Sequence, residues 1–281
     1  MFIADNTGDY AVLDTGSGDK LENIGGIIMQ RPDPQVIWER SGDTPWQPHA
    51  VYDRSATGGG SWRFIKKVPD KWAVTIGGLK FIVRPTGFKH IGVFPEQSFN
   101  WDYMTQRIKA ANRPVKLLNL FAYTGGATVA ALSAGASVVH VDAAKSMNDW
   151  AKDNVKQNGL EDAPVRFIAD DCHKFVLREQ RRGNTYDAIV MDPPSYGRSQ
   201  SGVWKIEDAL FELVKDCAKL LSDDPLFFII NSYTTGLSDV VTRNMLALCL
   251  NDGKIESDTL VLPQKNSGVY LPCGTTARWQ A

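Results

Sequence analysis

The sequence has 281 residues, of which 43% are hydrophobic and 22% are charged, and its formal net charge is −1. This length and apolar content predict one large or two modest folded domains and exclude a largely disordered chain. Basic and acidic residues are balanced in both parts of the chain, 11 against 12 in residues 1–105 and 20 against 20 in residues 106–281. A protein that coats nucleic acid through a strong overall field is therefore excluded.

The four cysteines lie far apart, without a CxxC pair or a histidine at metal-ligand spacing. We therefore expect reduced thiols, no disulfide framework and no metal site. The N-terminus lacks a signal-peptide pattern, and no apolar run approaches the roughly 18 residues of a membrane span. The expectation is a cytoplasmic protein outside the membrane, with an oligomeric state that the sequence does not define.

Residues 1–105 have the pattern of a small β-rich domain, in which short apolar stretches alternate with turn-forming residues. The expected strands are Tyr10–Leu13, Gly26–Met29, Val36–Trp38, Trp62–Lys66, Trp72–Ile76 and Leu79–Val83. The last two are joined by Gly77-Gly78, a two-residue turn typical of a β-hairpin.

From about residue 115 the pattern changes to strands alternating with helices. The expected strands are Val115–Phe121, Val138–Val141, Val165–Ile168, Ala188–Met191 and Phe227–Ile230. The expected helices are Ala127–Ala134, Lys145–Gln157, Cys172–Arg182, Lys205–Leu221 and Asp239–Leu250. This order predicts an α/β fold with a mostly parallel, doubly wound, Rossmann-like sheet in residues 106–281. Such sheets bind ligands beyond the carboxyl ends of their strands.

The first two strand ends carry residues suited to a nucleoside ligand. Gly125-Gly126 can adopt positive φ and let a ligand approach the backbone, and the following helix N-terminus offers free N–H groups. Asp142 closes the second strand, where a carboxylate can accept both ribose hydroxyls. The alternatives are a plain strand–helix connection for the glycines and a helix N-cap for Asp142.

The third and fourth strand ends carry Asp170-Asp171 and Met191–Tyr196. Asp171, favoured over Asp170, can accept from an adenine amine; the alternative is that one of the two caps a helix. In Met191–Tyr196 two prolines stiffen the chain, so that Asp192 and nearby carbonyls form a rigid set of acceptors. Such acceptors suit the exocyclic amine of a base, on which the Tyr196 ring can stack; the alternative is a structural turn.

These four strand ends in this order resemble the S-adenosylmethionine-dependent 23S ribosomal RNA methyltransferases of class I, which include a cytosine-C5 and a guanine-N7 enzyme. The similarity extends over about residues 75–281 and includes Phe94-Pro-Glu-Gln97. It implies S-adenosylmethionine as cofactor, 23S ribosomal RNA as partner, and residues 1–105 as a substrate-recognition domain before the methyltransferase domain, 106–281. The expected cofactor-binding residues are Gln97, Phe121, Ala122, Tyr123, Thr124, Gly125, Gly126, Asp142, Ala143, Asp171 and Cys172. The expected catalytic residues are Asp192, Pro193, Pro194 and Tyr196.

Two departures from that family bear on the reaction. An N-terminal RNA-binding PUA domain, which some members carry, is not expected here. The cytosine-C5 member has Ser-Cys-Ser after its fifth strand, whereas the matching segment here is Asn231–Leu237, without a thiol. Methylation at carbon needs covalent activation of the ring, so the sequence favours a nitrogen acceptor, such as one in guanine. Cys273 could supply a thiol from another loop, but a packed cysteine is the favoured interpretation.

A local basic segment is the main candidate for RNA contact. Residues 63–90 contain seven basic residues and one acidic residue, interleaved with Trp62, Phe64, Trp72, Phe81 and Phe88. Basic groups pair with phosphates and aromatic rings stack on bases, but a β-domain with core aromatics and solvated lysines predicts the same pattern. Further candidates are Arg181-Arg182 and Arg198.

Three other functions compete with methyl transfer to RNA. The same fold can methylate a protein side chain or a small molecule, and fold alone does not separate these substrates. A non-catalytic RNA-binding module is a further alternative, although the Asp192 motif and the glycine pair are retained. A nicotinamide dehydrogenase is disfavoured because the first turn lacks GxGxxG.

Overall fold

The computed structural model describes residues 1–40, 42, 45–55, 59–199 and 202–281, with the backbone alone at 198 and 199. The chain folds into two compact units. The larger unit comprises Met1, Asn100–Leu260 and Gly274–Ala281, and the smaller unit comprises Phe2–Phe99 and Val261–Cys273. The smaller unit thus takes in a segment from the C-terminal part of the chain, beyond the 1–105 range expected from the sequence.

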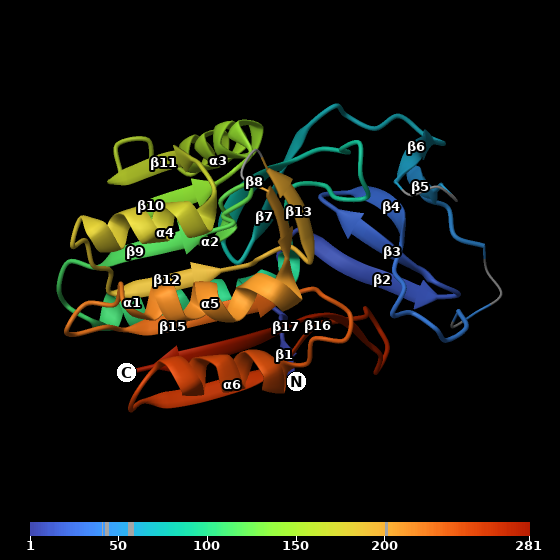
Figure 1. Cartoon of the computed structure of the whole chain (residues 1–281). Helices are drawn as coiled ribbons and strands as arrows, with labels where there is room; N and C mark the ends of the chain where they lie inside the picture. Colours follow the sequence, from blue (N-terminus) through green and yellow to red (C-terminus); the bar gives the residue numbers. More distant parts are fainter. Residues whose placement is uncertain (41, 43–44, 56–58, 200–201) are drawn as a thin grey trace. The chain divides into compact units, whose positions relative to one another are not determined.

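The larger unit is built on a mixed sheet with the strand order β16-β17-β15-β12-β9-β10-β11 (Figure 1). Its five parallel strands are β9 (Lys116–Leu120), β10 (Ser137–Asp142), β11 (Val165–Ala169), β12 (Ala188–Met191) and β15 (Phe227–Ser232). β17 (Tyr270–Gln280) runs antiparallel to β15, and β16 (Lys254–Pro263) follows it in the sheet. The expected doubly wound α/β sheet is confirmed.

Helices cover both faces of this sheet, as Figure 1 shows. One face carries α4 (Cys172–Arg181), α5 (Ile206–Ala218) and α6 (Asp239–Cys249). The other carries α1 (Ser98–Ala110), α2 (Gly126–Ser133) and α3 (Lys145–Gln157). Strands with helices on both sides are buried along their whole length, which explains the continuous apolar runs of β12 and β15.

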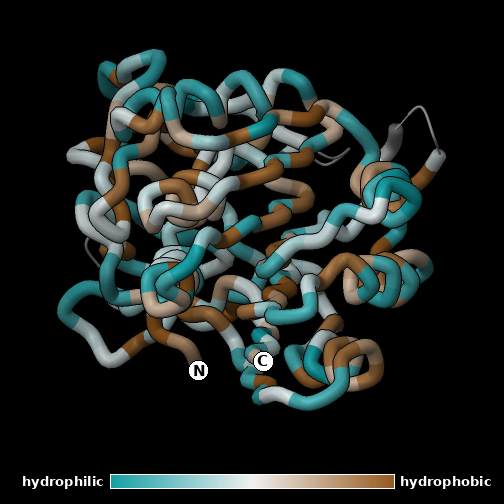
Figure 2. Tube along the Cα trace, turned by 90° about the vertical axis from the view of Figure 1, so that its left-hand side faces the viewer, coloured by the Kyte–Doolittle hydropathy of each residue, from teal (hydrophilic) through white to brown (hydrophobic). Residues whose placement is uncertain are grey.

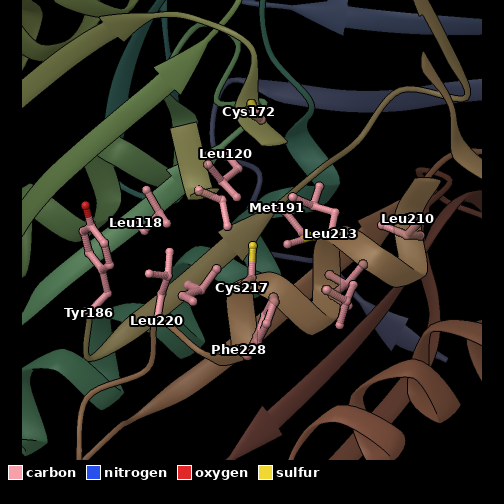
Figure 3. Packing of buried hydrophobic residues seen from close by; sticks show 14 of the residues in the cluster. Leu118, Leu120, Cys172, Tyr186, Met191, Leu210, Leu213, Cys217, Leu220 and Phe228 are labelled. Atoms are coloured by element: carbon pink, nitrogen blue, oxygen red, sulfur yellow. The ribbon is translucent and has the colours of Figure 1, made fainter. Parts of the chain in front are cut away.

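Every second side chain of the central strands points into the core beneath α4 and α5. Leu118 and Leu120 of β9 point into it, together with Met191 and Phe228, and Cys217 of α5 is fully buried among them (Figure 3). Figure 2 shows the apolar residues, in brown, gathered along the buried strands, with hydrophilic teal along exposed turns. None of the described helices is long and apolar enough to cross a bilayer.

The smaller unit is β-rich, as expected. Its main sheet has the order β2-β3-β4-β5-β6, formed by Tyr10–Gly16, Asp19–Ile24, Ile27–Pro32, Ala50–Arg54 and Gly60–Phe64. A separate hairpin, β7 (Trp72–Ile76) and β8 (Leu79–Val83), turns at Gly77-Gly78, where both φ angles are positive, and this prediction is confirmed.

The smaller unit departs from the expectation in several places, because strands β3 and β5 were not expected and one expected strand does not form. Val36–Trp38 forms no strand: the Val36 amide donates to Asp33 O in a turn, and the Val36 and Trp38 carbonyls accept from Gly18 and Ser17. The short strand β1 (Phe2–Ile3) precedes Ala4, whose amide donates to Val261 O. The returning C-terminal segment is held by Gln264, which accepts from the Thr15 hydroxyl at 2.6 Å.

Candidate active site

The carboxyl ends of four parallel strands lie side by side. Leu120 at the end of β9 pairs with Val141 of β10 on one side and with Met191 of β12 on the other. Asp142, which ends β10, pairs with Ala169 of β11. From β9 the next strands, β10 and β11, are added on one side, and β12 and β15 are added on the other. The carboxyl ends of β9 and β12 therefore lie at the topological switch point, at which doubly wound sheets bind ligands. The residues that follow the four strands therefore meet at one edge of the sheet.

The turn after β9 has an unusual backbone. Phe121 and Tyr123 have φ angles of 53° and 50°, in the left-handed region that non-glycine residues rarely adopt, and Gly125 has a φ of 85°. Each such non-glycine residue costs on the order of 1 kcal/mol or more, and such conformations cluster at ligand-binding sites. The turn persists because its amides are held: Phe121 N donates to Cys172 Sγ at 3.3 Å and Tyr123 N to Asp142 Oδ2 at 2.9 Å.

Asp142 connects this turn with the start of α3. Its Oδ2 accepts from Tyr123 N and its Oδ1 accepts from Ala144 N at 2.8 Å. Burial raises the pKa of the Asp142 carboxyl, and the two backbone amides oppose that rise. The N-cap of α3 is Ala144, without a side-chain cap, so Asp142 is not the helix cap that the alternative supposed. A carboxylate has about four lone-pair positions, so two amides leave it able to accept ribose hydroxyls.

A layer of buried polar side chains lies beneath the turn and was missed in the sequence. Asn154 of α3 donates to Thr124 O at 2.8 Å, and Thr128 of α2 bonds His140 Nδ1 at 2.9 Å. Asn148 donates to the backbone carbonyl of Asp142 at 3.2 Å. Desolvation lowers the pKa of His140 to about 3, so its ring is neutral. Asn148 and Asn154 are six residues apart in α3, and this spacing does not mark them in the sequence as residues that support a ligand site.

The two glycines of the turn are required by internal packing. A Cβ on Gly125 would lie 3.0 Å from Ala151 Cβ in α3, in addition to the strain of its positive φ. A Cβ on Gly126 would lie 2.5 Å from the Trp101 ring in α1. The sequence offered ligand approach or a plain strand–helix connection for these glycines; two helices approach them, and a role toward a ligand stays a prediction.

The third strand end separates the roles of its two aspartates. Asp170 pairs with Arg178 of α4 and accepts from Asp171 N at 2.8 Å. Asp171 is the N-cap of α4, where its carboxylate accepts from Lys174 N at 3.0 Å. One carboxylate oxygen of Asp171 thus caps the helix, as the alternative supposed. Cys172 is buried, and burial raises the pKa of its thiol far above the ordinary value.

The fourth strand end is braced by residues that the sequence did not single out. Trp204 Nε1 donates to Pro194 O at 2.6 Å, and its ring lies 5.2 Å from that of Phe121 in the turn after β9. Trp204 belongs to β14 (Gly202–Lys205), which pairs with β13 (Tyr196–Ser199) as a hairpin. A tryptophan thus connects the first and fourth strand ends.

The Asp192 motif is also joined to the segment after β15. Ser195 Oγ and Thr234 Oγ1 are 2.7 Å apart. Tyr196 is 51% exposed. The segment Asn231–Leu237 thus meets the Asp192 motif through the Thr234 hydroxyl.

Several sequence candidates are not among the residues that follow these strand ends. Gln97 is buried in the 3-10 helix Pro95–Gln97 of the smaller unit. Arg181 and Arg182 end α4, which starts at the carboxyl edge, so they lie at the opposite edge of the sheet; Arg182 pairs there with Glu179. The Arg198 side chain lies outside the described residues. Among the described residues no cluster of three or more metal-binding side chains occurs.

The polar groups at this edge fit the nucleoside half of S-adenosylmethionine. Asp142 offers acceptors for ribose hydroxyls at the end of the second strand. The strand order, with β11, β10, β9, β12 and β15 as third, second, first, fourth and fifth, is that of Rossmann-like nucleotide-binding proteins. Fold and site together thus define a Rossmann-like, nucleoside-binding class of protein.

Comparison with known proteins narrows this class. A family model described as S-adenosylmethionine-dependent methyltransferase matches residues 60–261. The crystal structure of an S-adenosylmethionine-dependent methyltransferase from Agrobacterium tumefaciens is 36% identical, covers 99% of this chain and 92% of its own, and has a TM-score of 0.95. The chain belongs to the S-adenosylmethionine-dependent methyltransferase family.

Relatives with named substrates match part of the chain. Ribosomal RNA large subunit methyltransferase K of Neisseria meningitidis serogroup B is 29% identical over 187 residues, which are 65% of this chain and 51% of the relative. Ribosomal RNA large subunit methyltransferase I of Cronobacter sakazakii is 35% identical over 134 residues, which are 47% of this chain and 33% of the relative. The chain thus spans about half or less of these relatives.

Proposed function

We propose that the protein transfers a methyl group from S-adenosylmethionine to a ring nitrogen of a base in ribosomal RNA. The observation that carries this proposal is the meeting of the strained turn after β9, Asp142 and Asp192 at one edge of the sheet. The ribosomal RNA substrates of the large subunit methyltransferases K and I support the choice of RNA. A cytoplasmic location follows from such a substrate.

The chain's own residues would hold the cofactor at this edge. Bound S-adenosylmethionine supplies an electrophilic methyl on its sulfonium. Asp142 orients the ribose, and one oxygen of Asp171 accepts from the adenine amine, while the other caps α4. The residues of the proposed cofactor site are Phe121, Ala122, Tyr123, Thr124, Gly125, Gly126, Asp142, Ala143, Asp171 and Cys172; Gln97, which belongs to the smaller unit, is not assigned to this edge.

The base would be held by Asp192, Pro193, Pro194 and Tyr196. The prolines stiffen this corner, and Trp204 fixes it further through the Pro194 carbonyl. That carbonyl is therefore a structural acceptor, and we assign the acceptance of the base's exocyclic amine to Asp192. The exposed Tyr196 ring stacks on the base face. Positioning of this kind suffices for a nitrogen that already carries a lone pair.

The cysteines argue against methylation at carbon, which needs an attacking thiolate. Cys172 and Cys217 are buried, and desolvation raises the pKa of both thiols. Cys249 lies on α6, where burial also raises its pKa. Cys273 lies in the smaller unit with its Sγ 3.5 Å from Leu271 O, and desolvation raises its pKa as well. Every thiol is thus biased away from the reactive form.

The two units are proposed to have different functions. We assign methyl transfer to the larger unit, which carries the strand edge, and substrate recognition to the smaller β-rich unit, in keeping with the 1–105 and 106–281 division of the sequence.

The proposal is tested by methyl transfer to RNA. The purified protein with methyl-labelled cofactor is incubated with ribosomal RNA from a strain that lacks the gene, and the methylated nucleoside is identified by mass mapping. We expect label in one ring-nitrogen-methylated base, with transfer that weakens as salt rises. Label in C5-methylcytosine would overturn the nitrogen acceptor, and label only in protein or small molecules would overturn the RNA substrate.

A further inference from the structure

The smaller unit exposes an unusual set of apolar side chains on a hydrogen-bonded backbone. Phe64 is 56% exposed, Ile65 is 53% exposed and Phe88 is 66% exposed. Exposed apolar side chains that gather in one place mark interaction sites more often than scattered single ones do. These three come from the end of β6 and from the turn after β8, which are far apart in the sequence.

The indole of Trp62 joins the two segments. Its Nε1 donates to Thr86 O at 2.9 Å, and its ring packs edge-on against the buried Tyr52. Side chains two apart on a strand share a face, so Phe64 lies on the same side of β6 as Trp62. The segments that carry Phe64 and Phe88 are therefore joined through one anchor, Trp62.

Both segments are held in place by hydrogen bonds. The hydroxyl of Thr86 bonds the carbonyls of Phe88 and His90 and the amide of Phe88. The amides of Ile65 and Lys66 both donate to His49 O, at 2.8 and 3.1 Å. A fixed backbone that displays apolar rings loses little conformational entropy when a ligand binds.

The charge around these rings is positive. Residues 63–90 contain seven basic side chains and only Asp70 as an acid. Arg63 is paired with Asp53 at 2.8 Å, so its charge is matched. Lys66 and Lys67, which directly follow Phe64 and Ile65 in the chain, are exposed. Phe81 is fully buried and Trp72 donates to Ile24 O, so these two aromatics belong to the fold itself.

We propose that Phe64, Ile65, Lys66, Lys67 and Phe88 form a binding surface for a single-stranded RNA segment, here called the Phe64–Phe88 surface. The rings stack on unpaired bases, and the two lysines pair with the neighbouring phosphates. Paired RNA is disfavoured because its bases are stacked within the helix and are not open to the rings. This inference rests on the proposed RNA substrate and names where the smaller unit contacts it.

The test compares two double variants with matched controls in the full chain. Phe64→Ala/Phe88→Ala removes the rings and Lys66→Gln/Lys67→Gln removes the charges. Phe211→Ala removes a phenylalanine of α5 that is 43% exposed, and Lys109→Gln/Lys156→Gln removes two exposed lysines elsewhere. Affinity for a short mixed-sequence single-stranded RNA is measured by fluorescence anisotropy over a range of salt, with duplex RNA as competitor. Calorimetry with S-adenosylhomocysteine shows whether each variant keeps an intact cofactor site.

We expect the phenylalanine double variant to bind the single strand about tenfold or more weakly, as loss of base stacking predicts. Phe64→Leu/Phe88→Leu should be weakened as well, because leucine keeps the apolar contact but not the stacking. The lysine variant should lower the salt slope by about 1.4, or roughly 0.7 for each phosphate that is no longer neutralised. The controls and the affinity for S-adenosylhomocysteine should stay within about twofold of wild type.

The outcomes separate this surface from the proposed function. Wild-type transfer to ribosomal RNA, with unchanged RNA affinity in both variants, would overturn the surface and leave the function standing. Equal competition by duplex RNA would overturn the single-stranded ligand. Absence of transfer by the wild type would count against the function, whatever the variants bind.

Discussion

At the scale of single residues, the site depends on backbone conformations that its neighbours enforce. Phe121 and Tyr123 adopt left-handed φ angles that an isolated turn would avoid. Asp142 and Cys172 hold the amides of these two residues from the next strand end and from the start of α4. The same side chains that complete the proposed ligand site therefore also offset its strain.

Asp192 provides the residue-scale prediction for the reaction. Asp192→Ala should abolish methyl transfer, because it removes the acceptor that orients the base, while affinity for S-adenosylhomocysteine stays within about tenfold, or about 1.4 kcal/mol. Transfer to ribosomal RNA and calorimetric titration measure the two quantities. Asp223→Ala, at an exposed aspartate, is the control and should change neither. Parallel loss of both in Asp192→Ala would make this residue a cofactor ligand first.

Three of the four strand ends were found in the sequence because each follows a largely buried, mainly apolar strand, whereas β11 before the third is only partly buried. Asp142 and Asp192 each come at the end of such a run, and parallel strands bring their ends to one edge. Trp204 could not be found in the same way. It acts on Pro194 only because the β13–β14 hairpin folds back, and no apolar periodicity marks that hairpin.

At the scale of elements, the glycine turn is a packing junction between three helices. Gly126 begins α2 beneath the Trp101 ring of α1, and Gly125 faces Ala151 of α3. Asn154 of α3 adds a hydrogen bond to Thr124 O in the same turn. Helix packing and the shape of the proposed cofactor site are therefore coupled, so that a change in one should be felt in the other.

Gly126→Ala tests this coupling. The added Cβ would meet the buried Trp101 ring at 2.5 Å, and overpacking of this kind costs about 1–3 kcal/mol. We expect a lower free energy of unfolding in urea and weaker binding of S-adenosylhomocysteine together. Gly268→Ala is the matched control, since its Cβ would meet open space, and it should not lower stability. Normal stability in Gly126→Ala would show that Trp101 yields without cost.

At the scale of the whole molecule, the sequence indicated the alternation of strands and helices but not the path of the chain between the two units. The doubly wound sheet was predictable because mainly apolar strands alternate with helices, most clearly at β12 and at the start of β15. The return of Val261–Cys273 to the smaller unit was not, because it depends on pairings such as Gln264 with Thr15, 249 positions apart. Long-range polar pairs of this kind leave no local pattern.

Two histidines, the buried His140 and the half-buried His90, give the molecule a predictable response to acid. Desolvation lowers the pKa of His140 to about 3 and that of His90 to about 4, from an ordinary 6.5. Between these values and 6.5 the unfolded chain binds more protons than the folded one, so stability is complete above 6.5 and is lost as the pH falls. Carboxyls with lowered pKa, such as Glu22 at about 2, act only below their ordinary 4.5.

We therefore expect the free energy of unfolding to fall between pH 6.5 and 4.5, with a limiting slope of about 1.4 kcal/mol per pH unit for each histidine. Urea unfolding of the full chain at several pH values measures it. In His140→Gln the amide can still meet Thr128, so the variant should be less sensitive to pH in this window, whatever its stability at pH 7. His90→Gln provides the same comparison in the smaller unit, and identical pH dependence in wild type and both variants would show that neither histidine is buried in its neutral form.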